Sequence, residues 1–127
     1  MEKLIIEGSA KTPSIHFDSE TGVLMLKGRS IPENSIEFYN PLNEWLEEYA
    51  VTPKNSTIVD VRLEYFNTSS SKCILDFFKK LERVNNNGKE VQVNWYFETD
   101  DEDMEEAGED YEAIVRLPFK IIEVEEI

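Results

Sequence analysis

The fold is decided by the stretch Tyr65-Phe66-Asn67-Thr68-Ser69-Ser70-Ser71, where one regular pattern of apolar residues gives way to another. Upstream, apolar and charged residues alternate with a period of two, as in a strand with one buried face. The apolar members are Val59, Val61, Leu63 and Tyr65. Downstream, four apolar residues have the i, i+3, i+4, i+7 spacing of a helix. These are Ile74, Phe77, Phe78 and Leu81. The sequence therefore predicts a strand that passes into a helix through a short polar turn.

Two further strand patterns follow this helix. The helix is predicted to end at Asn85-Asn86-Asn87-Gly88, and residues 91–97 then form an apolar, β-branched and aromatic run. Two strands separated by one helix predict a right-handed crossover with parallel pairing. Residues 118–124 supply a last strand.

The N-terminal part of the chain predicts a β-hairpin. Apolar segments at residues 14–18 and 23–28 flank the turn-rich Ser19-Glu20-Thr21-Gly22. The short apolar run at residues 4–6 predicts an additional edge strand.

A helix is expected between the hairpin and the central strand. The apolar residues assigned to its buried face are Ile36, Tyr39, Leu42, Leu46 and Tyr49. Pro41 interrupts this pattern and leaves two alternatives. The helix begins there with Asn40 as its cap, or a longer helix begins near Ser35 and bends at the proline.

Composition and charge limit the class of protein. The chain has 127 residues with 40% hydrophobic and 11% aromatic content, enough to fill the core of one domain spanning residues 1–127. Its net charge of −14 argues against nucleic acid or an anionic membrane as the main partner. No apolar run approaches the roughly 20 residues that cross a bilayer, and the acidic N-terminus does not match a signal peptide. A cytoplasmic protein with an α+β fold is expected, with a mixed sheet and helices packed mainly on one face.

Thr68 is the first candidate functional residue. A hydroxyl at the N-terminal end of a helix lies where backbone N–H groups and the helix dipole favour negative charge, so a phosphoryl group would find partners there. Simple capping of the helix by Asn67, Thr68 or Ser69 is the alternative explanation for these residues. However, one cap is needed, and five consecutive polar residues are present, followed by Lys72.

An acidic block lies between the last two strands. Asp101, Asp103, Glu105 and Glu112 occupy positions 1, 3, 5 and 12 of a calcium-binding loop, but Glu106 stands where that loop requires glycine. A mobile acidic loop that runs into a solvated helix is the simpler interpretation. A divalent-cation-binding module using this block remains an alternative function, and so does an acidic surface for a basic partner protein.

Residues for catalysis are scarce. His16 is the only histidine and lies in a strand pattern, and Cys73, the only cysteine, lies beside Ile74 on the predicted helix as a core or boundary residue. No nucleophile elbow or glycine-rich phosphate loop is present. A non-enzymatic protein is expected, and a hydrolase is the weaker alternative.

The chain resembles the SiaC-type biofilm regulatory phosphoproteins, a small bacterial family similar in fold to the STAS domains of anti-anti-sigma factors. The resemblance covers nearly the whole chain. It rests on Leu63-Glu64-Tyr65-Phe66-Asn67-Thr68-Ser69-Ser70-Ser71-Lys72, on Ile36-Glu37-Phe38-Tyr39 with Trp45-Leu46, on Val93-Asn94-Trp95-Tyr96, and on residues 101–112 followed by Leu117-Pro118-Phe119.

The resemblance implies a phosphorylation switch at Thr68. A dedicated Ser/Thr kinase would modify this residue, and a PP2C-like phosphatase would restore it. The unphosphorylated form would bind and activate a diguanylate cyclase, which connects the switch to cyclic-di-GMP signalling. The residues expected to form the surrounding recognition surface are Asn67, Ser69, Ser70 and Lys72, with no cofactor or metal.

Overall fold

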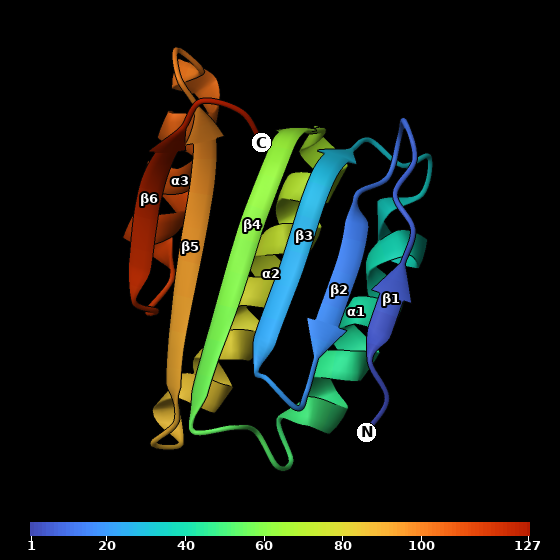
Figure 1. Cartoon of the computed structure of the whole chain (residues 1–127), viewed down its shortest axis with the longest axis vertical. Coiled ribbons are helices and arrows are strands. Elements are labelled where there is room, and N and C mark those ends of the chain that lie inside the picture. Colours follow the sequence, from blue (N-terminus) through green and yellow to red (C-terminus); the bar gives the residue numbers. More distant parts are fainter.

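The computed structural model describes all 127 residues as one six-stranded sheet and three helices. The strands are β1 (Leu4–Ile6), β2 (Ser14–Asp18), β3 (Val23–Ser30), β4 (Ser56–Phe66), β5 (Glu90–Glu98) and β6 (Phe119–Val124). The helices are α1 (Ser35–Tyr49), α2 (Thr68–Asn86) and α3 (Glu102–Ile114). The strands lie in the sheet in the same order as in the sequence (Figure 1).

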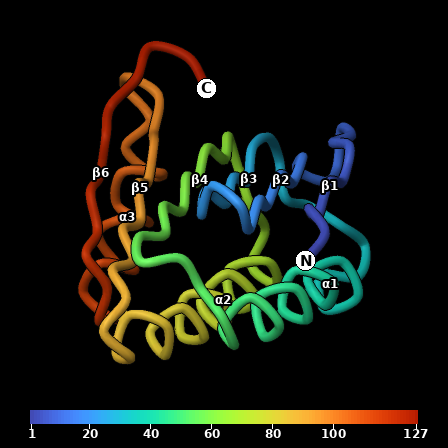
Figure 2. Tube along the Cα trace, turned by 60° about the horizontal axis from the view of Figure 1, so that its bottom comes forward, coloured from blue at the N-terminus to red at the C-terminus, as the bar shows by residue number.

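The sheet is mixed because its two halves are connected differently. β1, β2 and β3 pair antiparallel through short turns, whereas β3 to β6 pair parallel, each pair joined by one helix. α1 and α2 lie side by side along one face of the sheet (Figure 2). α3 packs on that same face, because its Tyr111 contacts Phe78 of α2 and Trp95 of β5. The predicted α+β fold, with its hairpin and its helices on one face, is confirmed, and it is compatible with a STAS-like arrangement.

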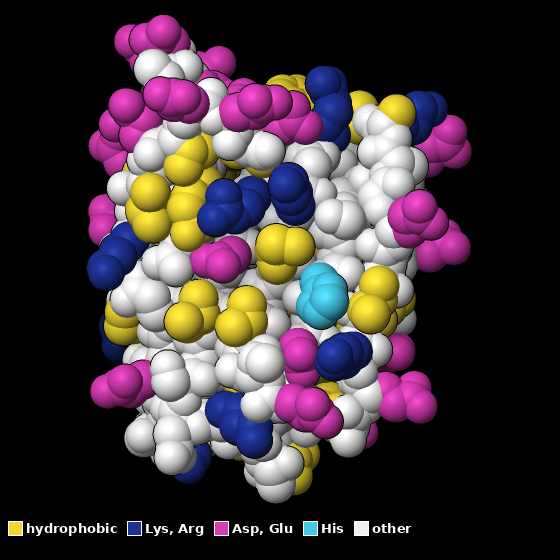
Figure 3. Space-filling model, in the orientation of Figure 1, with side chains coloured by type: hydrophobic (Ala, Val, Ile, Leu, Met, Phe, Trp, Pro, Cys, Tyr) yellow, Lys and Arg dark blue, Asp and Glu magenta, His cyan; other side chains and the backbone are white.

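The core lies between the sheet and the helices and consists of 26 buried hydrophobic residues. Strand alternation places Val59, Val61 and Leu63 in it, as predicted, and Cys73 is also buried there. The opposite face of the sheet carries no helix and presents a mixture of hydrophobic, basic and acidic side chains, with His16 near its centre (Figure 3). None of the three helices combines the length and the apolar character needed to cross a membrane.

Helix α1 follows the longer of the two predicted alternatives. It begins at Ser35, its cap is Asn34, whose side-chain oxygen accepts the N–H of Glu37, and Pro41 lies inside it. Ile36, expected on the buried face, is instead 78% exposed. At 100° per residue Ile36 falls well outside the arc defined by Tyr39 and the later core residues, and Ser35 takes the inward position.

The alternation of β4 is broken near its end. A register shift between Gly28 and Arg29 of β3 places Leu63 opposite Gly28 but Tyr65 opposite Arg29. Tyr65 is therefore 52% exposed, against the prediction that it continues the buried side. Phe66 takes the inward direction and packs edge-on against Trp95.

Candidate functional site

The predicted polar turn connects β4 directly to α2. Asn67 is the N-cap, because its side-chain oxygen accepts the backbone N–H of Ser70 at 2.9 Å. Its own N–H donates to the carbonyl oxygen of Ser30 at 2.9 Å, which fixes the turn against the end of β3. Thr68 is thus the first helical residue and is exposed. Asn67 therefore caps the helix, whereas Thr68, the next residue, exposes its hydroxyl.

Ser70 is fully buried in a network of hydroxyl groups. Its hydroxyl accepts from Ser30 Oγ at 2.9 Å and donates to the Ser30 carbonyl oxygen at 3.1 Å. Ser30 Oγ also lies 2.7 Å from the phenol oxygen of Tyr39, and burial raises the pKa of that phenol to about 12. Ser70 was predicted on the recognition surface, but with no exposed area it supports that surface from below.

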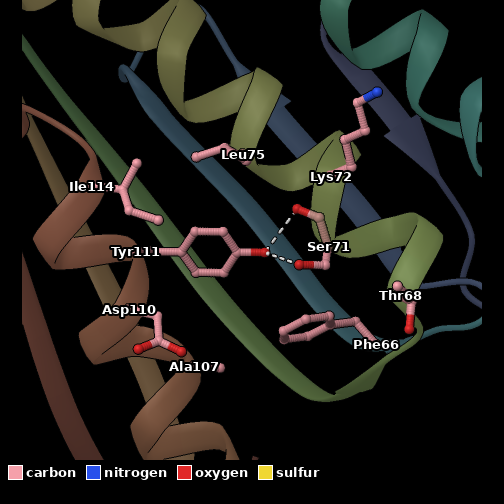
Figure 4. Close-up of a pocket in the computed structure, with 9 residues that line it drawn as sticks. All are labelled: Phe66, Thr68, Ser71, Lys72, Leu75, Ala107, Asp110, Tyr111 and Ile114. Atoms are coloured by element: carbon pink, nitrogen blue, oxygen red, sulfur yellow. Dashed lines mark hydrogen bonds between the residues drawn. The ribbon is translucent and has the colours of Figure 1, made fainter.

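The neighbouring serines are also engaged. Ser69 Oγ lies 2.6 Å from Ser35 Oγ and donates to the Asn67 side chain at 3.2 Å. Ser71 Oγ lies 3.2 Å from the phenol oxygen of Tyr111. In the run from Thr68 to Ser71, the Thr68 hydroxyl alone has no hydrogen bond within the protein, and its side chain points away from the Ser71–Tyr111 pair (Figure 4).

A groove of about 470 Å³ lies beside this turn, between α2 and α3 (Figure 4). Five of its nine lining residues are hydrophobic. The lining residues are Phe66, Thr68, Ser71, Lys72, Leu75, Ala107, Asp110, Tyr111 and Ile114. Tyr111 closes its floor by donating to the Ser71 carbonyl oxygen at 2.9 Å, and burial raises the pKa of this phenol to about 12.

Lys72 is exposed one turn after Thr68, but the two side chains extend in different directions in Figure 4. A phosphoryl group on Thr68 would therefore meet this ammonium group only after the lysine side chain rotates.

The acidic block forms a helix and not a loop. Asp101 caps α3 by accepting the N–H of Met104 at 3.2 Å, and the acids of the first turn, Glu102, Asp103 and Glu105, lie at the positive end of the helix dipole. The calcium-loop alternative is wrong, since a continuous helix cannot wrap positions 1 to 12 around one ion. No group of three or more His, Cys, Asp or Glu side chains is placed to hold a metal. The expected mobile loop is likewise reduced to Thr99–Asp101.

A model of the family described as SiaC family regulatory phosphoproteins matches residues 6–124. The chain belongs to this SiaC family. An uncharacterized protein of Pseudomonas aeruginosa strain UCBPP-PA14 is 33% identical over 121 residues, which are 95% of this chain and 96% of that protein.

Solved structures of SiaC from P. aeruginosa share the fold of this SiaC family member. In the crystal structure of the diguanylate cyclase SiaD with its activator SiaC, the similar chain has a TM-score of 0.89 and 32% identity, covering 95% of this chain and 99% of that one. The crystal structure of apo-SiaC gives a TM-score of 0.88 and 33% identity, with 96% and 99% coverage. The family resemblance found in the sequence is thereby confirmed.

Several residues at the site of this SiaC family member escaped the sequence analysis. Ser30 and Ser35 are single serines at the ends of elements, and nothing in their spacing connects them with the turn 40 and 34 residues away. Tyr111 lies within the acidic block, and its bond to Ser71 depends on how α3 packs against α2, which the spacing of residues in one helix does not predict.

Proposed function

We propose that residues 1–127 form one non-enzymatic regulatory domain that binds and activates a diguanylate cyclase when Thr68 is unphosphorylated. Through this cyclase, the domain controls cyclic-di-GMP and biofilm signalling in the cytoplasm. Membership in a family of regulatory phosphoproteins supports this proposal. It is further supported by the P. aeruginosa complex in which SiaC is the activator of the cyclase SiaD.

One observation carries the assignment to Thr68: its hydroxyl is free, whereas those of Ser69, Ser70 and Ser71 are engaged. A kinase must bring its γ-phosphate to an accessible hydroxyl oxygen. Ser70 has no exposed area, and modification of Ser69 or Ser71 would break bonds to Ser35 or Tyr111. A Ser/Thr kinase and a PP2C-like phosphatase would therefore act on Thr68 without disturbing the fold.

Phosphorylation would act locally. The phosphoryl group adds about −1.5 to −2 charge and three acceptor oxygens at pH 7. On a chain whose net charge is already −14, this dianion repels an acidic partner surface. Burying this dianion in the contact with the cyclase would also cost much more free energy than burying the neutral hydroxyl of Thr68. Binding is lost in this mechanism while the fold is kept.

The test measures binding by titration calorimetry and cyclic-di-GMP formation from GTP, with a SiaD-type diguanylate cyclase. Thr68→Ala should bind and activate like the wild type but resist phosphorylation, as read by mass spectrometry after incubation with the kinase and ATP. Thr68→Asp should weaken binding. Thr52→Asp is the matched control, because Thr52 is also exposed and lies in the connection from α1 to β4, which is at the opposite end of β4 from Thr68 (Figure 1).

Two results would reject the proposal. One is a Thr68→Asp variant that binds and activates the cyclase as well as the wild type does. The other is a kinase product in which the phosphate is on a serine while Thr68 stays unmodified.

A further inference from the structure

We propose that the groove between α2 and α3 receives a hydrophobic side chain of the cyclase, so that Thr68 stands at the edge of an apolar docking pocket. This inference rests on the proposed function, because it names the part of the cyclase that the Thr68 surface recognises. The groove holds about 470 Å³, room for one or two large side chains.

The lining of the groove favours an apolar occupant. Leu75 from α2 and Ala107 and Ile114 from α3 face it, and Ile114 is 57% exposed. The two hydroxyl groups at its floor, those of Ser71 and Tyr111, already bond to each other, and the Tyr111 hydroxyl also donates to the Ser71 carbonyl oxygen. An incoming hydrocarbon group therefore leaves no polar group of the floor without a partner.

The floor of the groove is packed against the aromatic core. The ring of Tyr111 lies 5.3 Å from those of both Phe78 and Trp95 and 6.3 Å from that of Phe66, measured between centroids. These contacts connect α3 to α2 and β5. A preformed pocket spares the complex the entropy cost of ordering it on binding.

Continuity with the switch residue identifies the occupant as the cyclase. Thr68 is itself one of the nine lining residues, so a protein that covers this hydroxyl also covers the groove. The charged lining residues have opposite signs and come from different helices, Lys72 from α2 and Asp110 from α3. A complementary cyclase segment would place an acidic residue toward α2 and a basic residue toward α3, on either side of its apolar anchor.

This arrangement also explains how one phosphate could block a hydrophobic contact. A dianion on Thr68 would stand beside the inserted side chain and would lose water as the groove is covered. It would also repel the acidic residue that pairs with Lys72. Both effects act on the complex and leave the free protein folded.

The test compares the affinity of single variants for the SiaD-type cyclase by titration calorimetry. Ile114→Ser removes apolar contact at the rim, and Ala107→Phe fills the groove; each should raise Kd about tenfold or more, as for buried anchors at other interfaces. Val51→Ser is the matched control, since Val51 is 78% exposed in the turn after α1, and it should leave Kd within about twofold. Circular dichroism and urea unfolding confirm that each variant is folded.

The outcomes separate this inference from the proposed function. If Thr68→Asp weakens binding while Ile114→Ser and Ala107→Phe bind like the wild type, the groove proposal fails and the switch stands. If Thr68→Asp has no effect but the groove variants bind weakly, the switch fails and the groove stands. A second copy of this chain is the other possible occupant of the groove, and sedimentation of the chain alone tests for it. The groove proposal would be overturned if the chain formed a dimer that Ile114→Ser dissociates while the affinity for the cyclase stays unchanged.

Discussion

The hydroxyl of Ser30, at the end of β3, donates a 2.9 Å hydrogen bond to the hydroxyl of Ser70, in the first turn of α2. Both side chains are completely buried, and Ser30 also contacts the phenol of Tyr39 in α1. One strand and two helices are therefore joined by buried hydroxyl groups. This contact holds the start of α2, where Thr68 is the first helical residue, against the end of β3.

Ser70→Ala should lower the free energy of unfolding by about 1 to 3 kcal/mol, because the buried hydroxyl and carbonyl oxygen of Ser30 each lose one of their two hydrogen-bond partners. Thr68→Ala, two residues away, is the control: it removes a hydroxyl that makes no hydrogen bond in the fold and should change stability by no more than about 0.5 kcal/mol. Urea unfolding followed by circular dichroism measures both. Equal stabilities for the two variants would show that the Ser30–Ser70 contact contributes nothing.

Periodicity predicted most of the fold because each strand and helix has one buried face. The alternation through Val59, Val61 and Leu63 and the helical spacing of Ile74 and Phe78 follow directly from that requirement. The resemblance to the family likewise depended on local motifs. Where a residue was placed on the wrong face, the cause was either a break in the regular period of its segment or a contact with another segment.

Three such cases show what local patterns omit. Tyr65 turns outward because β4 has one extra residue, Glu64, where its pairing with β3 shifts register, and Ser70 turns inward because Ser30 and Ser35 offer it hydrogen-bond partners. Asp101, which looked like the first ligand of a calcium loop, starts a helix by capping it. Each outcome depends on tertiary neighbours or on a choice between two local uses of the same side chain, and a single sequence records neither.

Gly108→Ala should destabilise the protein even though alanine is the better helix former by about 1 kcal/mol. A Cβ atom at Gly108 would lie 2.5 Å from Cδ1 of Trp95, a fully buried ring whose N–H donates to the Met104 carbonyl oxygen. Because α3 or the ring must move, we expect a loss of about 1 to 3 kcal/mol in urea unfolding.

Ala113→Gly tests the same helix at an exposed position in its last turn, where only helix propensity matters and no more than about 1 kcal/mol should be lost. A Gly108→Ala variant more stable than the wild type would mean that α3 does not pack this closely on β5.

The buried phenols of Tyr39 and Tyr111 predict how stability depends on alkaline pH. Burial raises the pKa of each to about 12, from an ordinary value of 10.0. Below pH 10 both tyrosines keep their protons in the folded and unfolded chains, so they add no pH dependence. Between pH 10 and 12 the unfolded chain loses these protons first, and the free energy of unfolding should fall by up to about 1.4 kcal/mol per pH unit for each phenol.

Tyr39→Phe and Tyr111→Phe should each remove about one proton from this dependence, measured by urea unfolding between pH 8 and 11. Each variant also loses a hydrogen bond, so its stability at pH 8 will be lower. The ionisation of the phenol is therefore read from the slope of the unfolding free energy against pH, and not from its value at one pH. Absorbance of tyrosinate at alkaline pH provides an independent measurement, in which both variants should lose a late-titrating group. If both variants gave the same slope as the wild type, these phenols would ionise as readily in the folded chain as in the unfolded one. That result would contradict the burial of Tyr39 and Tyr111 in this structure.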